Sequence, residues 1–197
     1  MVLENTPTIK TQRLILRKFR ETDVHSFLEI MSDETVNTYL PWFPIATIEE
    51  AAAALEERCL SQYQKPSAYH YAICLEDGIP IGYINVGNEP NHDLGYGLRK
   101  EFWHKGITTE AAIAVVSRVK EAGYRFITAT HDVNNPRSGE VMKKLGMTYR
   151  YSYVEQWQPK NISVTFRMYQ INFNASDEAT YMGYWETYST HFIEQSI

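Results

Sequence analysis

The chain has 197 residues, which at roughly 100–200 residues per domain predicts one domain with room for an appendage. Hydrophobic residues make up 44% and charged residues 22%, a balance that excludes disordered and collagen-like proteins. The 19 Lys and Arg against 24 Asp and Glu give a net charge of −5, which argues against direct nucleic-acid binding because phosphate contacts need a cationic surface.

The sequence carries no signal of a membrane or of an oxidising compartment. No apolar run approaches the roughly 18–20 residues of a membrane span, and residues 1–13 lack a signal-like stretch. The two cysteines, Cys59 and Cys74, cannot form a disulfide framework or a four-ligand zinc site, so we expect packing residues and no metal. A cytoplasmic protein is predicted.

In chain order, the first half combines a strand, two helices and a β-meander. Residues 12–19 alternate apolar and charged side chains, which predicts a half-buried strand. A helix follows Arg20, and a second helix begins at Thr47 with Glu50 three positions on, as in a capping box, and continues to about residue 63. Residues 69–75 and 79–86 flank Asp77-Gly78, a hairpin signal, and residues 93–98 extend the meander.

In the second half of the chain the period of the hydrophobic pattern changes to that of a helix. Residues 108–122 predict a helix that ends at Gly123, and residues 124–130 predict a strand. A helix opens at Asn135-Pro136, and residues 147–157 and 162–171 predict a closing hairpin. The sum is an α+β fold with a mixed sheet.

The segment that points to chemistry is residues 95–111, in which a short strand leads through a basic loop into a helix. Free backbone N–H groups and the dipole of a helix N-terminus hold phosphate, and Gly106 allows close approach. The segment lacks the Walker pattern, and Gly95-Tyr96-Gly97 is followed by Lys100 where a dinucleotide motif needs glycine. ATP and NAD are therefore poor candidates.

Three segments together resemble the GNAT superfamily of N-acetyltransferases, in particular its RimJ/RimL-like branch. They are the strand at residues 95–98, the loop and helix start at residues 103–111, and residues 135–138 with 144–147. The resemblance covers about residues 8–171. It implies a mixed, mostly antiparallel sheet with a splayed central strand and flanking helices, a domain over residues 1–171, and acetyl-CoA as cosubstrate.

The resemblance also implies which residues contact the coenzyme. The strand pairs with pantetheine, the loop and helix start bind pyrophosphate, and the downstream helix start completes the site; these residues are Tyr96, Gly97, Leu98, His104, Lys105, Gly106, Ile107, Thr108, Thr109, Asn135 and Ser138. Arg99, Lys100 and Lys105 adjoin Gly106, which favours phosphate contacts over a solvated basic face. Asn135 and Ser138 have a structural alternative as helix-capping residues.

Acetyl transfer to an amine needs a polarised carbonyl, a neutral amine and a proton for the departing thiolate. The resemblance assigns the first to the backbone N–H near Leu98 and places Ser138 near the coenzyme sulfur, whereas Met142 stands where many relatives have a tyrosine acid. Glu155 is the expected base.

The case for Glu155 depends on strand alternation. Tyr149, Tyr151, Tyr153, Glu155 and Trp157 alternate onto one strand face, and an aromatic surround raises a carboxyl pKa. A solvated edge carboxylate, with His92 or Asp93 as the proton acceptor, is the alternative.

Residues 172–197 form an extension beyond the resemblance. It has no Lys or Arg and carries Asp177, Glu178, Glu186 and Glu194. Aromatic side chains at helical spacing predict a helix over 176–193, capped by Ser176, that docks on the sheet or on a second subunit. Alternatively, its acidity forms a rim that attracts a cationic amine.

These observations predict an acetyl-CoA-dependent N-acetyltransferase that transfers acetyl directly to a primary amine. The acceptor is a polypeptide N-terminus, as the RimJ/RimL-like resemblance suggests, or a small amine, and the protein is a monomer or homodimer. The alternative is a catalytically silent GNAT-fold module that binds an acyl-CoA, which the absence of a tyrosine at Met142 leaves open.

Overall fold

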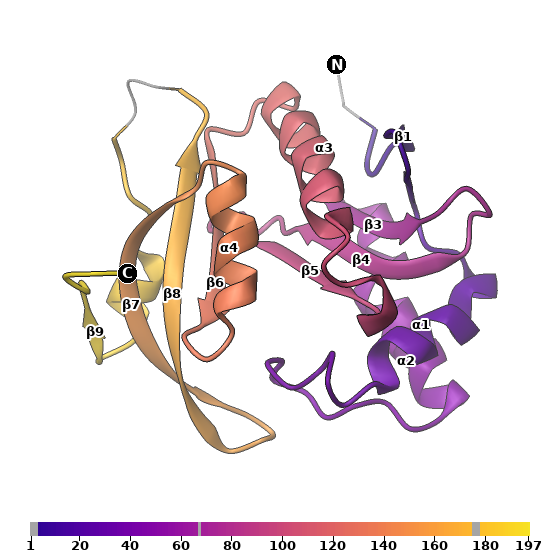
Figure 1. Ribbon diagram of the computed structural model, residues 1–197, viewed down its shortest axis with the longest axis horizontal. Helices are drawn as coiled ribbons and strands as arrows, with labels where there is room; N and C mark the ends of the chain where they lie inside the picture. Colours follow the sequence, from indigo (N-terminus) through magenta and orange to yellow (C-terminus); the bar gives the residue numbers. More distant parts are fainter. Residues whose placement is uncertain (1–3, 67, 175–177) are drawn as a thin grey trace.

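The computed structural model describes residues 4–66, 68–174 and 178–197 (Figure 1). The helices are α1 (Val24–Ser32), α2 (Ile48–Arg58), α3 (Ile107–Glu121), α4 (Pro136–Lys144) and α5 (Gly183–Thr187). The strands are β1 (Ile9–Lys10), β2 (Ile15–Arg17), β3 (Tyr69–Cys74), β4 (Pro80–Val86), β5 (Leu94–Leu98), β6 (Phe126–Asp132), β7 (Thr148–Trp157), β8 (Ile162–Asn172) and β9 (His191–Phe192). No helix in these ranges is long and apolar enough to cross a membrane.

The strands form two antiparallel sheets that meet at β5 and β6. One sheet has the order β1-β2-β3-β4-β5 and the other β6-β8-β7-β9. In the described ranges a single parallel bridge, Asp93 with Thr128, joins β5 to β6, and beyond it the two strands diverge. The expected α+β fold with a splayed central strand is confirmed.

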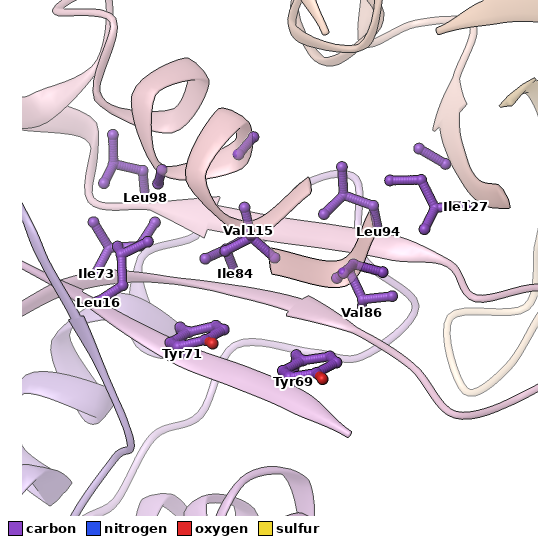
Figure 2. Close-up of a cluster of buried hydrophobic side chains, with 14 of the residues drawn as sticks. Leu16, Tyr69, Tyr71, Ile73, Ile84, Val86, Leu94, Leu98, Val115 and Ile127 are labelled. Carbon is purple, nitrogen blue, oxygen red and sulfur yellow. The ribbon is translucent and has the colours of Figure 1, made fainter. Parts of the chain in front are cut away.

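Helices cover both faces of the five-stranded sheet (Figure 1). On one face, Val115 of α3 packs in a buried cluster with Ile73, Ile84 and Leu94 from the strands (Figure 2). On the other face, Phe27 of α1 and Leu55 of α2 belong to a second cluster. These two faces are called the α3 face and the α1/α2 face below. The two cysteines are buried and unpaired in the second cluster, as packing residues.

Local sequence signals explain how the helices begin and pack. The Thr47 Oγ1 accepts from the Glu50 N–H at 3.2 Å, and a Glu50 carboxylate oxygen accepts from the Thr47 N–H at 3.3 Å, so the capping box is confirmed. α4 packs closely on β6 because Gly139 has no side chain: a Cβ there would lie 2.6 Å from the His131 ring. The expected bounds of the central elements are confirmed to within a few residues.

The extension does not form the single helix expected over 176–193. It contains only the five-residue helix α5, and β9 then pairs with β7, covering an edge that would otherwise expose unpaired backbone groups. Ser176 and Asp177 lie outside the described residues. The aromatic side chains do dock on the sheet: Tyr184 and Tyr188 stack on Tyr153 with ring centroids 4.9 and 4.7 Å away.

The acidity of the extension is partly neutralised within the fold. Glu194 accepts from Arg167 Nε at 2.9 Å and Nη2 at 2.6 Å, and from the Ser152 hydroxyl at 2.6 Å. These contacts, led by the hydrogen bond from Arg167, hold the pKa of Glu194 below its usual value. The extension itself has no cation, as its sequence shows, but Arg167 of β8 compensates the charge of Glu194.

We predict that Glu194→Gln lowers the free energy of unfolding by about 1.5–3 kcal/mol at pH 7, the range for hydrogen bonds to charged groups. A depressed carboxyl pKa stabilises the fold above the unfolded value of about 4.3, and the contribution is lost as pH falls further. Urea unfolding at pH 7 and pH 3.5 measures both effects. Glu186→Gln, on an exposed side chain of the same extension, is the control and should change little. Equal losses in the two variants would contradict the anchoring role.

Candidate active site

The backbone of β5 presents unpaired groups to the gap beside β6. The Gly87 N–H donates to the Asp93 carbonyl at 3.2 Å and the Arg99 N–H to the Ile81 carbonyl at 2.9 Å. Because antiparallel pairing alternates, residues 95 and 97 also bond to β4, and the N–H groups of Tyr96 and Leu98 point toward β6. The edge of β5 that faces the gap therefore has free donors.

The N-terminus of α3 lies beyond the end of β5 and is open to an anion. Its first internal hydrogen bond runs from the Glu110 N–H to the Gly106 carbonyl, at 3.0 Å, so the N–H groups of residues 107–109 have no acceptor in the helix. Gly106 has φ +73° and His104 has φ +59°, which turn the preceding loop into the left-handed region. Together with the helix dipole, this arrangement suits an anion such as phosphate.

The loop before α3 is fixed from the N-terminal side of the chain. Arg13 donates to the Lys105 carbonyl at 2.9 Å and forms an ion pair with Glu110 at 2.7 Å, and the Thr11 hydroxyl donates to Glu110 at 2.6 Å. His104 and Lys105 are exposed, whereas Ile107 is buried. Ile107 can therefore contribute only its backbone to a bound group.

Two of the three cationic side chains expected near phosphate, Arg99 and Lys100, form ion pairs with carboxylates. The Arg99 guanidinium pairs with Glu29 and Glu101, and Lys100 Nζ lies 2.9 Å from Asp33 Oδ2. Glu29 belongs to α1 and Asp33 follows it, so these contacts tie the end of β5 to the α1/α2 side. Both cations are paired with carboxylates, and their phosphate contacts stay a prediction.

The start of α4 meets β5 through a contact that sequence reasoning missed. The Tyr96 hydroxyl donates to the Ser138 carbonyl at 2.9 Å and lies 3.0 Å from Ser138 Oγ. Burial raises the pKa of Tyr96, so the phenol keeps its proton. Asn135 occupies the N-cap position without capping through its side chain, and Met142 is buried in the α3-face core. A strand tyrosine and a helix serine 42 positions apart give no local signal of this pairing.

Two carboxyl groups outside the α3 face, those of Asp93 and Glu155, have raised pKa values. Asp93 shares with Gly95 and Gly97 the face of β5 that points away from α3, because side chains alternate along a strand. Burial raises the pKa of Asp93 to about 6, although Thr128 and Tyr184 donate hydrogen bonds to it. Burial also raises the pKa of half-buried Glu155, which accepts a hydrogen bond from Tyr188.

The face of β7 that carries Glu155 differs from the expectation in one residue. A register irregularity between Tyr149 and Tyr151 places Tyr149 with the α3-face core, against Tyr169, while Tyr151, Tyr153 and Trp157 pack with the extension. The extra residue of the bulge shifts the alternation by one. Among the described residues, no group of three or more His, Cys, Asp and Glu side chains is placed to hold a metal ion.

A diverging strand beside an anion-binding helix start defines an acyl-CoA-type transferase fold, and the comparisons with known proteins agree. The family model for the acetyltransferase (GNAT) domain matches residues 13–148. The chain is 30% identical over 157 residues to YnaD of Bacillus subtilis (strain 168), an uncharacterized N-acetyltransferase, covering 77% of this chain and 88% of that protein. This chain belongs to the GNAT acetyltransferase family.

Solved structures share the fold. A GNAT-family acetyltransferase from Bacillus anthracis superposes with a TM-score of 0.72 at 26% identity, covering 85% of this chain and 99% of that one. RimL, a ribosomal L7/L12 alpha-N-protein acetyltransferase solved with coenzyme A, gives 0.74 at 19% identity, covering 84% and 98%. The microcin C7 self-immunity acetyltransferase MccE, solved with acetyl-CoA and AMP, gives 0.72 at 15%, covering 82% and 93%.

We predict that Gly106→Val weakens coenzyme A binding by more than tenfold, because a side chain there obstructs close approach of pyrophosphate to the backbone. Gly123→Val is the matched control: Gly123 also has positive φ, +88°, and follows the other end of the same helix. Both substitutions strain the backbone by roughly 1–2 kcal/mol, so both lower stability. Calorimetry should show weaker coenzyme A binding only for Gly106→Val. Unchanged coenzyme A affinity in a folded Gly106→Val variant would show that the pyrophosphate does not bind to this loop.

Proposed function

We propose that this protein transfers acetyl from acetyl-CoA directly to a primary amine. The observation that carries the proposal is the free edge of β5, whose Tyr96 and Leu98 N–H groups face a gap that ends at the α3 N-terminus. Pantetheine carries amide groups that can pair with such an edge, and pyrophosphate is the anion that suits the helix start. In this proposal, residues 104–109 hold pyrophosphate and Asn135 and Ser138 line the sulfur end.

The proposed reaction uses groups on both sides of the gap. The Leu98 N–H polarises the thioester carbonyl, the amine nitrogen bonds to the carbonyl carbon, and the C–S bond breaks. Ser138 gives a proton to the departing thiolate and regains one from solvent, while the Tyr96 hydroxyl, 3.0 Å from Ser138 Oγ, holds the serine in position. Glu155 or Asp93 accepts the proton that the amine loses.

The relatives narrow the chemical class of the acceptor only in part. RimL is an alpha-N-protein acetyltransferase of a ribosomal protein, which gives a polypeptide N-terminus a precedent among proteins of this fold, and MccE was solved with a small molecule, AMP. We keep the RimJ/RimL-like branch, a cytoplasmic location and a monomer or homodimer as predictions. The alternative, a silent acyl-CoA-binding module, predicts coenzyme binding without thiol release across a panel of amines and basic peptides.

Ser138→Ala tests proton delivery. We expect turnover to fall by about 10²–10⁴-fold, the usual cost of losing a general acid, while acetyl-CoA affinity changes little. Ser117→Ala, which removes a hydroxyl from α3 away from the gap, is the control and should leave turnover unchanged. Steady-state kinetics with thiol detection measures both. If Ser138→Ala retains full activity, Ser138 is only a first-turn residue of α4 and its hydroxyl does not deliver the proton.

The pH profile identifies the base. A carboxylate must be deprotonated to accept a proton, so kcat/KM of the wild type should fall as pH drops through a raised carboxyl pKa, which for Asp93 is about 6. Asp93→Asn and Glu155→Gln each remove one titrating group, and the variant of the true base should lose both activity and this fall. An unaltered profile in both variants would exclude both carboxylates and point to ordered water.

A further inference from the structure

A cavity of about 520 Å³ lies on the α1/α2 face, between α2 and the strands β3 and β4. Its walls are largely aromatic and apolar, and they include Phe19, Phe27, Met31 and Trp42. Polar side chains line the same space, among them Arg58, His70, Tyr83 and Asn85. A mostly apolar pocket of this size with a few convergent polar groups is typical of a small-molecule site.

Arg58 gives the cavity its charge. Its guanidinium stacks on the Trp42 ring, 4.1 Å from the centroid, and within the described part of the chain its buried Nη1 has no hydrogen-bond partner. Native proteins rarely leave a buried guanidinium N–H unpaired, because its desolvation is then not compensated. A group that accepts hydrogen bonds from Arg58 would complete this wall.

The other titratable side chains of the interior are neutral. Burial raises the pKa of Cys59 and of Tyr83 to about 12, and burial together with Lys65 lowers the pKa of His70 to about 4. The remaining charged side chains of the lining, Glu57, Lys65 and Glu89, are exposed at the rim, where solvent screens them. The interior therefore presents one cation.

The cavity adjoins the strand on which acetyl transfer is proposed. Tyr83 lies against Gly97, where a Cβ would come within 2.5 Å of the ring, and a Cβ on Gly95 would lie 3.2 Å from Asn85 Oδ1. Both glycines belong to the edge strand β5, and both contacts are on the face of that strand opposite α3. The Tyr83 and Asn85 side chains thus form the wall that the cavity shares with β5.

We propose that this cavity binds the acceptor, and that the acceptor is a small amine with an aromatic or apolar body and a carboxylate that pairs with Arg58. The proposal rests on the proposed acetyl transfer and narrows its substrate class. The Arg58 guanidinium lies over the Trp42 ring, its Nη1 has no hydrogen-bond partner among the described residues, and its planar fork of donors matches the two oxygens of a carboxylate. The amine end then points toward β5, and the aromatic wall holds the body.

The test compares acceptors that differ only in the carboxylate. Phenylalanine and tyrosine are paired with phenethylamine and tyramine, and thiol release from acetyl-CoA is measured with each. We expect the wild type to favour the amino acids in kcat/KM by about ten- to hundredfold, the equivalent of hydrogen bonds to a charged group. Arg58→Gln should abolish this preference by raising KM for the amino acids while leaving the amines unchanged. Lys65→Gln, at the rim of the same cavity, is the matched control.

Further measurements distinguish the ways in which the proposal could fail. Arg58→Lys, which keeps the cation but loses the planar fork, provides the comparison if Arg58→Gln does not fold. A peptide that begins with phenylalanine and ends in an amide tests the polypeptide N-terminus, and preference for it over free phenylalanine would overturn the proposal. So would equal use of amine and amino acid by the wild type. If none of the acceptors caused thiol release although coenzyme A bound tightly, that result would instead contradict the acetyl transfer itself.

Discussion

The divergence of β5 from β6 is the constraint on which the rest of this structure depends. A strand edge with unpaired N–H and C=O groups is costly when buried, so the fold must hold the gap open and leave it accessible to a partner that can pair. One end is closed by the bridge between Asp93 and Thr128. At the other end, the Trp103 indole donates to the Leu98 carbonyl at 2.7 Å, which satisfies an acceptor without covering the neighbouring donors.

The gap also separates two chemically different sides. On the α3 side the groups that face a ligand are mainly backbone donors, at the edge of β5 and at the start of α3, and the Tyr96–Ser138 contact links strand to helix. On the opposite side the glycines of β5 accommodate the Tyr83 and Asn85 side chains, and Asp93, Glu155 and the Arg58 cavity provide carboxyl groups and a cation. Donor and acceptor chemistry can therefore approach the same strand from two directions.

Much of this arrangement can be predicted from local patterns. Asp77-Gly78 determines a hairpin and Thr47 with Glu50 a helix start because each signal acts within a few residues. The failures are non-local. Helical spacing of aromatic residues could not reveal that the edge of β7 would recruit residues 191–192, and alternation along β7 could not reveal the bulge that turns Tyr149 inward. The Tyr96–Ser138 and Arg58–Trp42 contacts depend on tertiary packing and have no signature in the sequence.

The extension affects Asp93, at the closed end of the gap, through its position more than through its charge. Arg167 neutralises Glu194, whereas the Tyr184 hydroxyl accepts from Asn91 at 2.6 Å and donates to Asp93 at the closed end of the gap. Stacking of Tyr184 and Tyr188 on Tyr153 buries this region, and burial is the largest cause of the raised pKa of Asp93. Because desolvation favours the neutral acid, undocking the extension would lower the pKa of this carboxyl. Residues 178–197 therefore belong to the environment of Asp93, although the GNAT family match ends at residue 148.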